Sequence, residues 1–531
     1  MRVTANDPQL QANARFGGAS VISMGLLLVA LNVIAHFLPF ERASLGNDDY
    51  ALLLRARRTS VSDLLALTPR QPERPLGFLT LMLQEKWVDD NPRLGLWLVL
   101  ASTSAVLIAV FFFLHALTND RGVAVIGSLL FCLMPHKLEV YHQPIFVYME
   151  LANLLYLMSL MGLLAYAAQG RRALLLLSLA GYGLAVFIYP TGWLLPLSVT
   201  LYLAVTKRQP LRVTCYFFLL ATGYLVVKFT RCFGLADQPS MFPSQASVVM
   251  LPTNLGDLMH HYGGRYLIRN ILYGTYKFPS IEWPWLGIII ACDLIALGLL
   301  WRWLKSLSLG RPERPLISLS VALFVTSLIP ILMNALGGVG GRHLVLPSVG
   351  LSLLGTGLLA TVRRGWRPAL LGVVAAALVI CQGNAWSQVV ACRLNATVYD
   401  TLKAMQATLR QAAAERLIID TRSFADRIPF TWVQRDFNVL NTYYGAQAFE
   451  SWGLASMAQL ALGPAGPDVY IATERPRPTE DGAWEFSISE QTGYRAVEKK
   501  ILRVPQSRTA VLDFRAVFGE EFEHGRGRTQ S

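Results

Sequence analysis

Two adjacent aspartates, Asp48 and Asp49, stand just after the first long apolar run of the chain, in the segment GNDDYALLLRAR. A carboxylate held just above an apolar layer can accept a proton from a hydroxyl group that arrives from the aqueous side. Acidic pairs are also frequent in solvated turns and at helix N-termini, which is the simpler alternative. We interpret the pair as candidate catalytic bases and leave open which of the two acts.

A second cluster lies in the segment LFCLMPHKLEVYHQP, between two apolar runs. Pro135 ends one run and Pro144 begins the next, so the ionisable side chains between them occupy a tight corner. These side chains are His136, Lys137, Glu139 and His142. Ionisable groups at membrane depth are costly and usually face a polar cavity or a partner. The positive members can meet a phosphate at the level of the lipid headgroups, or Lys137 and Glu139 can simply pair with each other.

A third cluster follows four glycines in the segment GGVGGRHLVLPSVG, where Arg342 and His343 open an apolar run. Glycine lets the backbone approach closely, so this pair can sit against an anion. The alternative is a flexible turn with an arginine that reaches toward the interface. Arg74, in PERPLGFLT, is a fourth candidate, because Pro75 is well placed to begin a helix.

The composition indicates which elements position these residues. The chain has 531 residues, of which 53% are hydrophobic and 15% are charged, with a mean hydropathy of +0.41. A soluble protein of this length carries more polar surface, so most of the chain is expected in a membrane. A spanning helix takes about 20 apolar residues. We predict a mainly α, polytopic membrane protein with about eleven transmembrane helices, at residues 17–40, 94–117, 122–136, 145–168, 173–189, 192–206, 213–235, 284–304, 316–336, 344–362 and 368–388.

The net charge of +13 is distributed unevenly and predicts the orientation. Basic and acidic side chains balance beyond residue 388, and nearly the whole excess falls on one alternate set of loops between the predicted spans. Short loops rich in Lys and Arg remain in the cytoplasm. The N-terminus is therefore predicted to be cytoplasmic, and the loops 41–93 and 237–283 and the C-terminal segment extracytoplasmic. Because the excess charge reflects topology, it argues against nucleic acid as a partner.

Residues 1–388 are thus predicted to form a transmembrane domain, and residues 389–531 a soluble extracytoplasmic α/β domain. In the latter a helical stripe precedes the strand-like stretches RLIIDT, PDVYIATE, WEFSISE and AVLDFRAVF, which are separated by turn residues. The stripe consists of Leu394, Val398, Leu402, Met405 and Leu409. Leucine runs in loop 41–93 predict interfacial amphipathic helices. The segment 260–283 mixes Tyr, Trp and Arg as interfacial segments do, and Arg265 within it is a candidate substrate-binding residue.

The order of these motifs resembles that of the GT-C membrane glycosyltransferases. Paired acids in a first outer loop, NDDY, are followed by RPLGFLT, by the two-span corner MPHKLEV, and by a late span entered through GRHLVLPSVG. The similarity is strongest to the mannosyltransferase branch that carries tetratricopeptide tails and to its bacterial relatives, and it covers the chain up to residue 365 or so. The corner departs from the family pattern by keeping only Pro135 and Glu139, and the C-terminal segment shows no 34-residue repeat. Donor sugar and acceptor therefore do not carry over.

The resemblance implies an inverting transfer of a sugar from a polyprenyl-phosphate donor to an acceptor hydroxyl on the extracytoplasmic face. It makes Asp48 or Asp49 the base, and it assigns four residues to the donor phosphate, namely Arg74, Lys137, Arg342 and His343. The remaining candidates would bind substrate, and these are His136, Glu139, His142 and Arg265. The six cysteines have no metal-ligand spacing, so no metal site and no resident cofactor are predicted, while a divalent metal is left open.

Two other classes stay open as alternatives. A transporter or lipid flippase also has many spans, but usually shows paired repeats with broken helices near the midplane. An O-antigen ligase or polymerase also uses polyprenyl-linked sugars, and it is expected to have essential Arg and His residues in a large late outer loop and dispensable first-loop aspartates. The expectation is an integral, multi-pass protein of a bacterial inner membrane that builds a cell-envelope glycan, with a glycan, lipid or protein as acceptor.

Overall fold

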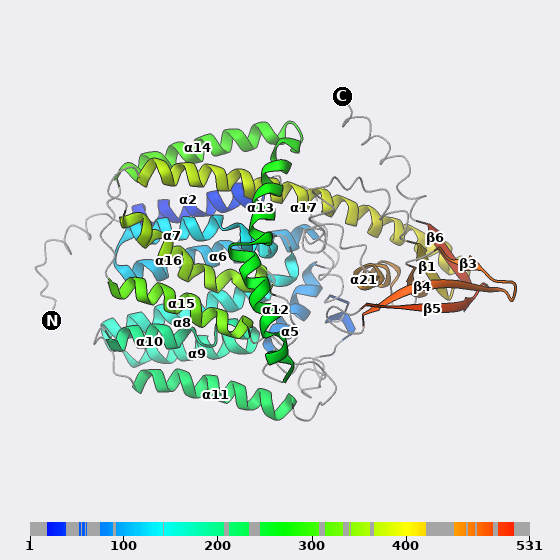
Figure 1. Ribbon diagram of the computed structural model, residues 1–531, viewed down its shortest axis with the longest axis horizontal. Coiled ribbons are helices and arrows are strands. Elements are labelled where there is room, and N and C mark those ends of the chain that lie inside the picture. The colour runs from blue at the N-terminus through cyan, green and yellow to red at the C-terminus, as the bar shows by residue number, and fades with distance from the viewer. Residues whose placement is uncertain are drawn as a thin grey trace, which may run out of the picture.

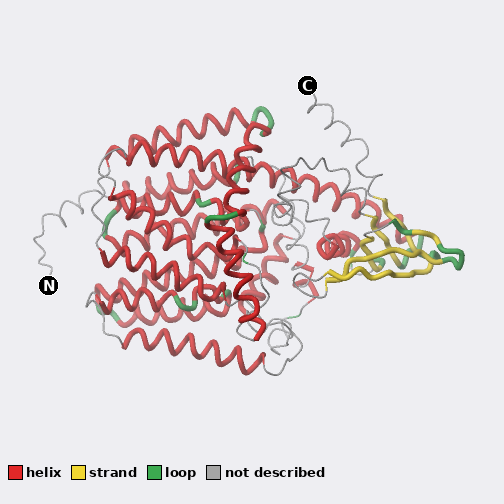
Figure 2. The backbone as a smooth tube through the Cα atoms, viewed as in Figure 1, coloured by secondary structure: helices red, strands yellow, loops and turns green. Residues whose placement is uncertain are grey.

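The chain is mainly helical in a computed structural model, with a small region of β-sheet toward its C-terminal end (Figure 1). The structure describes residues 18–38, 53–54, 56–58, 60, 75–88, 92–141, 143–205, 212–232, 245–306, 314–332, 339, 341–361, 366–420, 451–463, 466–472, 475–491 and 497–513. Most of the helices run side by side in one bundle, and the strands lie beyond one end of it (Figure 2).

Each of the eleven predicted ranges falls on a helix of the bundle. These helices are α2 (Gly18–His36), α6 (Pro92–Thr118), α7 (Arg121–Leu133), α8 (Val147–Gln169), α9 (Arg172–Ile188), α10 (Leu195–Val205), α11 (Arg212–Cys232), α14 (Trp285–Ser306), α15 (Arg314–Leu332), α16 (Val345–Thr361) and α17 (Trp366–Gln411). Within the described residues, five helices are long and apolar enough to cross a membrane, namely α6, α8, α14, α16 and α17. Five others are apolar but shorter: α2, α7, α9, α11 and α15. The membrane character is thus supported, and the count of eleven spans remains a prediction.

Short connections make consecutive helices antiparallel, which gives the bundle two distinct ends. Between α6 and α7 the chain turns at Asn119, which has a φ of 52°, and Asp120 caps the next helix by accepting a hydrogen bond from Val123 N at 3.2 Å. We call this the basic end, because the helix termini here carry Arg121, Arg171, Arg172, Arg302, Lys305 and Arg367.

The opposite end is built differently, from short 3-10 segments that turn the chain between helices. We call it the corner end. Its segments are η1 (Pro135–Tyr141), η2 (Pro144–Phe146), η3 (Pro190–Gly192), η4 (Phe278–Ser280) and η5 (Gly341–Leu344). A short helix, α5 (Pro75–Val88), packs here against α9 and the start of α8. The side chain of Gln84 on α5 donates a hydrogen bond to the carbonyl of Pro144, which fixes α5 to η2.

Packing inside the bundle depends on small residues, as is usual where helices meet in a membrane. Ser159 on α8 donates to the carbonyl of Ser178 on α9 at 2.8 Å, and Ser178 donates back to the carbonyl of Ser159 at 2.6 Å. The outer surface of the bundle is apolar instead: Leu177 is 68% exposed and Leu294 is 67% exposed. Exposed leucines of this kind fit a bundle surrounded by lipid.

Two further helices cross the bundle instead of running along it. In Figure 1, α12 (Gln245–Tyr262) and α13 (Arg265–Lys277) run across the other helices near the corner end. They are joined through Gly263 and Gly264 and follow each other end to end (Figure 1), and we call them the crossing helices. One face of α13 packs closely on α17, because Gly274 and Gly383 leave no room for a side chain between the two backbones. The other partners of the crossing helices are α15 and η1.

The last helix of the bundle, α17, leaves it and enters the C-terminal region (Figure 1). The predicted boundary between residues 388 and 389 lies within this one continuous helix, since no proline or glycine interrupts it there. The predicted stripe is buried at Val398, Leu402 and Leu409, which are at most 4% exposed. It packs against α21 (Ser451–Leu462).

The strands form two three-stranded sheets. The first has the order β2-β1-β6 and is parallel, with β1 (Arg416–Asp420) between β2 (Asp468–Ala472) and β6 (Thr509–Asp513). The second has the order β3-β4-β5 and is antiparallel, with strands β3 (Arg477–Pro478), β4 (Ala483–Gln491) and β5 (Val497–Pro505). The four predicted stretches correspond to β1, β2, β4 and β6. Strand β5 was not predicted, and β3 lies in a stretch that was predicted as a turn.

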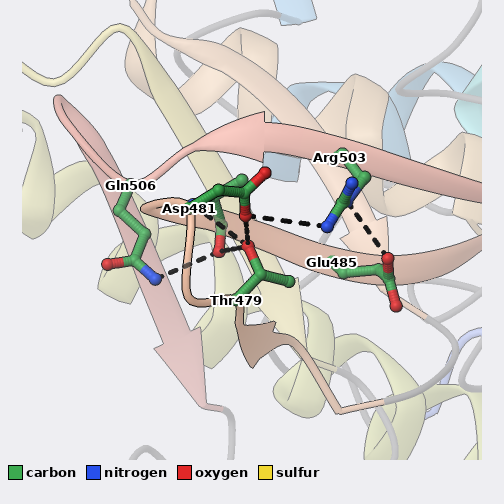
Figure 3. A network of polar contacts seen from close by, with 6 residues as sticks. Thr479, Asp481, Glu485, Arg503 and Gln506 are labelled. Atoms are coloured by element: carbon green, nitrogen blue, oxygen red, sulfur yellow. Dashed lines mark hydrogen bonds and ion pairs between the residues drawn. The ribbon is translucent and has the colours of Figure 1, made fainter.

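A polar network holds the turn between β3 and β4, as Figure 3 shows. Thr479 donates a hydrogen bond to Asp481, and Arg503 on β5 lies 3.6 Å from Asp481 and 3.2 Å from Glu485. Gln506 donates to the carbonyl of Ala483 at 3.0 Å. The ion-paired side chains are exposed and belong to β4, β5 and the turn before β4, so the network orders the turn and contributes little to stability.

Candidate functional site

The corner segment η1 buries its first histidine. His136 is 4% exposed, and its Nε2 lies 2.8 Å from Oγ of Ser348 on α16. Because the Ser348 hydroxyl donates to the carbonyl of Leu344 at 2.5 Å, it accepts from His136, which carries its proton on Nε2. Burial, together with the nearby positive charge of Lys137, holds the pKa of His136 well below its usual value. His136 is therefore a neutral hydrogen-bond donor that ties η1 to α16.

Lys137 points into the protein interior and is only 1% exposed. Its Nζ donates to the hydroxyl of Tyr141 at 2.7 Å and lies 4.0 Å from the centroid of the Phe131 ring. Burial lowers the pKa of Lys137 to about 8, an effect that the interaction with the Glu150 carboxyl and the Cys132 and Cys381 thiols offsets only in part. This ammonium therefore lies beneath the surface of the corner end.

Tyr141 links Lys137 to the first helix of the bundle. Its ring stacks on that of His36, with centroids 3.7 Å apart and an interplanar angle of 4°. His36, in the last turn of α2, forms a hydrogen bond of 3.0 Å with the carbonyl of Cys132. Deeper in the bundle, Glu150 on α8 is 2% exposed and accepts a hydrogen bond from Asn153 at 3.1 Å. A buried polar cluster thus extends from η1 into the bundle.

The second predicted cation-bearing segment, η5, packs directly on η1. A Cβ at Gly341 would collide with the main-chain oxygen of His136, so only glycine permits this approach. Arg342 is half-buried, and its guanidinium carbon lies 4.9 Å from the centroid of the Phe146 ring in η2. His343 is 6% exposed and its ring is parallel to that of Tyr189, with centroids 6.3 Å apart. Of the two cations described in η1 and η5, Arg342 lies nearer the surface.

The crossing helices α12 and α13 form hydrogen bonds with the main chain of η1 and with that of Val339, which lies two residues before η5. Asp257 accepts a hydrogen bond from Val339 N at 3.3 Å, and His261 donates to Val339 O at 2.6 Å. Asn270 donates to Pro135 O at 3.0 Å. Burial lowers the pKa of His261 to about 4, and the bond to the Val339 carbonyl opposes that shift. A neutral His261 therefore donates through Nε2.

The remaining predicted site residues cannot be placed in the same way. Asp48, Asp49, Arg74 and His142 lie outside the described residues. Glu139 is in η1 and Arg265 opens α13, but their side chains also lie outside the described part of the structure. The structure therefore brings together His136 and Lys137 with Arg342 and His343.

Other residues of this cluster were not expected from the sequence. They are His36, Tyr141, Glu150, Asp257, His261, Asn270 and Ser348. Tyr141 carried a usable signal, because it follows Lys137 by four positions and such residues meet on one face of a helical turn. The acid Glu150 was recognisable as a rare ionisable group inside a span. Among the described residues, no group of three His, Cys, Asp or Glu side chains is placed to hold a metal ion.

No protein-family model matches the chain, and no curated protein matches it either. The class that the fold itself defines is a mainly helical protein with helices apolar enough to cross a membrane and a small C-terminal sheet region.

Proposed function

We propose that the protein is an inverting glycosyltransferase that moves a sugar from a polyprenyl-phosphate donor to an acceptor hydroxyl at the corner end. The observation that supports this most is the contact between η1 and η5. These two segments carry three of the four predicted donor-binding residues, namely Lys137, Arg342 and His343. A hydrogen bond joins His136 in η1 to Ser348 in α16, the helix that follows η5, across 212 positions of the sequence. Their meeting at the end opposite the basic loops agrees with an extracytoplasmic site.

Arg342 is the residue best placed to bind the donor phosphate. It is half-buried at the corner end, and Phe146 supports its guanidinium from one side. A planar guanidinium binds two oxygens of one phosphate, and a fixed cation stabilises the negative charge that develops there as the glycosidic bond breaks. His343 and the main chain of Gly341 flank it in η5.

Lys137 has a different role in this proposal from the one the family resemblance implies. Because its ammonium lies under the surface against Tyr141 and Phe131, it positions η1 and does not contact the phosphate. The electrostatic contribution of Lys137 at the surface is correspondingly smaller than that of Arg342.

The reaction is a single displacement. Asp48 or Asp49 takes the proton of the acceptor hydroxyl, and the acceptor oxygen forms a bond to the anomeric carbon of the sugar from the side opposite the phosphate. The bond between that carbon and the phosphate oxygen breaks, and its electron pair leaves with the polyprenyl phosphate. The configuration at the anomeric carbon is therefore inverted.

Variants at the aspartates test this mechanism. Membranes that contain the protein are incubated with labelled polyprenyl-phosphate hexoses, and both transferred sugar and released polyprenyl phosphate are measured by mass spectrometry. An amide keeps the shape of the carboxyl but cannot accept the acceptor's proton near neutral pH. Asp48→Asn or Asp49→Asn, or both, should abolish transfer while a bound donor still copurifies, because the donor phosphate is held by other segments.

The alternatives give different results in the same assay. A ligase or polymerase would transfer sugar with both aspartates replaced. A transporter or flippase would release no polyprenyl phosphate in the presence of any donor. Full activity of the Asp48→Asn, Asp49→Asn double variant would reject the mechanism, and the absence of turnover with every donor offered to the wild-type protein would reject the function.

A further inference from the structure

The crossing helices α12 and α13 bury polar side chains on one face and expose large apolar side chains on another. Their buried polar residues are Asn254 (0% exposed), Asp257 (8%), His261 (6%) and Asn270 (4%). The first three are spaced three and four positions apart, so they form one helical stripe. This stripe faces the bundle.

The polar side chains of the buried stripe form hydrogen bonds with main-chain groups of the bundle. Asn254 donates to the carbonyl of Leu332 at the end of α15 at 2.9 Å. Asp257 and His261 hold the two main-chain groups of Val339, and Asn270 binds the carbonyl of Pro135. These hydrogen bonds explain why polar side chains are tolerated at the buried face.

Another face of the crossing helices carries large exposed apolar side chains, spaced by four residues within each helix. On α12 these are Leu251, Leu255 and Met259, which are 43%, 47% and 66% exposed. On α13 they are Ile268, Leu272 and Tyr276, which are 52%, 53% and 53% exposed. Thr275 lies beside them, and its hydroxyl bonds to the carbonyl of Ile271 in its own helix at 2.8 Å.

This arrangement is the reverse of that in a helix that faces water. A helix at an aqueous surface turns its apolar stripe toward the core and its polar stripe toward solvent. Six large apolar side chains in one continuous stripe would form a costly exposed patch in water. The medium next to this face is therefore apolar.

The exposed row continues into the apolar surface of the bundle. Helix α13 ends at Lys277, and the chain then passes Trp283, which is 76% exposed, and enters α14. There Ile288 and Ile295 are 43% and 64% exposed. The ammonium of Lys277 lies 5.5 Å from the Tyr273 ring centroid. A lysine and aromatic rings between two apolar surfaces are typical of the boundary between lipid tails and headgroups.

We infer that the outer face of α12 and α13, lined by Leu251, Leu255, Met259, Ile268, Leu272 and Tyr276, lies against the lipid bilayer at the boundary between acyl chains and headgroups. The crossing helices run across the long axis of the bundle (Figure 1), so they lie along the plane of the membrane. Their lipid contact fixes their depth, and their inner hydrogen bonds fix η1 and Val339, two residues before η5, relative to them. The inference does not depend on the proposed glycosyl transfer.

Photo-crosslinking to lipid tests the contact in the full-length chain. The photoreactive residue p-benzoylphenylalanine is placed singly at Leu255, Ile268 and Leu272, and the protein is reconstituted in vesicles of phosphatidylethanolamine and phosphatidylglycerol with tagged acyl chains. Leu176, 67% exposed on α9, is the lipid-facing control, and Ile501, 68% exposed on β5, is the matched control beyond the bundle. After irradiation, the tag on the protein is quantified.

We expect the three positions on the crossing helices to acquire lipid tag at levels close to that of position 176 on α9 and well above that of position 501 on β5. Levels nearer to position 501 would overturn the inference. Crosslinks between two copies of the chain at positions 268 and 272, in place of lipid tag, would also overturn it by identifying a protein partner. As a second readout, Leu272→Asp should lower the thermal stability of the reconstituted protein, whereas Ile501→Asp should leave it unchanged, and equal effects would count against lipid contact.

Discussion

At the basic end, the side chains of Arg171, Arg172, Arg302 and Lys305 are exposed. At the corner end, by contrast, four ionisable side chains of η1, η5 and α12 are buried: Lys137 is 1% exposed, and His136, His261 and His343 are at most 6% exposed.

The two ends therefore use charge for different purposes. Exposed cations at helix ends cost little and direct the orientation of a chain in a membrane. Burying an ionisable group costs several kcal/mol unless hydrogen bonds compensate, so a protein keeps such groups where they hold a geometry or do chemistry. The comparison predicts that changes at the corner end alter turnover and changes at the basic end alter only stability.

The largest effect is expected at Arg342. Arg342→Ala should reduce turnover by about 10²-fold or more, because the loss of one group that stabilises developing charge costs about 3–4 kcal/mol. Arg172→Ala removes an exposed arginine at the basic end and should leave turnover at the wild-type value. Turnover is measured per molecule of inserted protein, as release of polyprenyl phosphate.

Arg342→Lys separates charge from shape. It keeps a cation but loses the planar fork that binds two phosphate oxygens, so turnover should be intermediate. If Arg342→Ala and Arg172→Ala turned over equally, Arg342 would not bind the donor, and the contrast between the two ends would not be catalytic.

A smaller effect is expected at Lys137, in the dependence of stability on pH. In the unfolded chain this ammonium keeps its proton up to its ordinary pKa of 10.5, whereas in the folded protein the proton leaves near pH 8. Between these values the folded state binds fewer protons, so the free energy of unfolding rises with pH; below pH 8 both states are protonated and this contribution is flat. At about 1.4 kcal/mol for each pH unit, the rise amounts to about 3 kcal/mol.

Lys137→Met keeps much of the side-chain volume and removes the titrating group. Its advantage in stability over the wild-type protein should therefore shrink by about 3 kcal/mol between pH 8 and pH 10.5, as followed by denaturation in detergent. Lys305→Met, which removes an exposed ammonium at the basic end, is the matched control against which this change is read. A constant difference between Lys137→Met and the wild-type protein would mean that Lys137 is solvated.

The sequence predicted much of the fold because the dominant signal was hydrophobic length. Every predicted range coincides with a helix, since apolar runs of this kind have few alternatives to helix in a membrane. The crossing helices α12 and α13 were not predicted as helices that pack on the bundle, because their polar stripe faces the protein and their apolar stripe faces outward. Strand β5 was missed because Lys499, Lys500 and Arg503 give it a charged sequence, and its pairing with β4 is tertiary information.

The candidate site was predicted only at the level of segments. The sequence placed His136, Lys137, Arg342 and His343 on one side of the membrane, and the structure brings the segments that carry them into contact at Gly341. The direction of an individual side chain could not be read in advance: Lys137 turns inward because Tyr141 and the Phe131 ring receive its ammonium there. His36 was missed because one histidine at the end of a span has no motif around it.

The smallest effect is expected at Asp120, which caps α7 at the basic end and accepts a hydrogen bond from Val123 N. Asp120→Ala should lower the free energy of unfolding by about 1 kcal/mol, the usual cost of losing an N-cap, while Asp120→Asn keeps an acceptor and should lose little.

Because α7 runs directly from this cap into η1, the two Asp120 variants also test whether the basic end and the corner end are independent. Turnover should be unchanged in both variants, since the cap is a helix length away from Arg342 and the corner is held by its own hydrogen bonds to α12, α13 and α16. A loss of turnover in Asp120→Ala beyond what its fraction of folded protein explains would show that α7 transmits strain to η1, and the division of roles between the two ends would then fail.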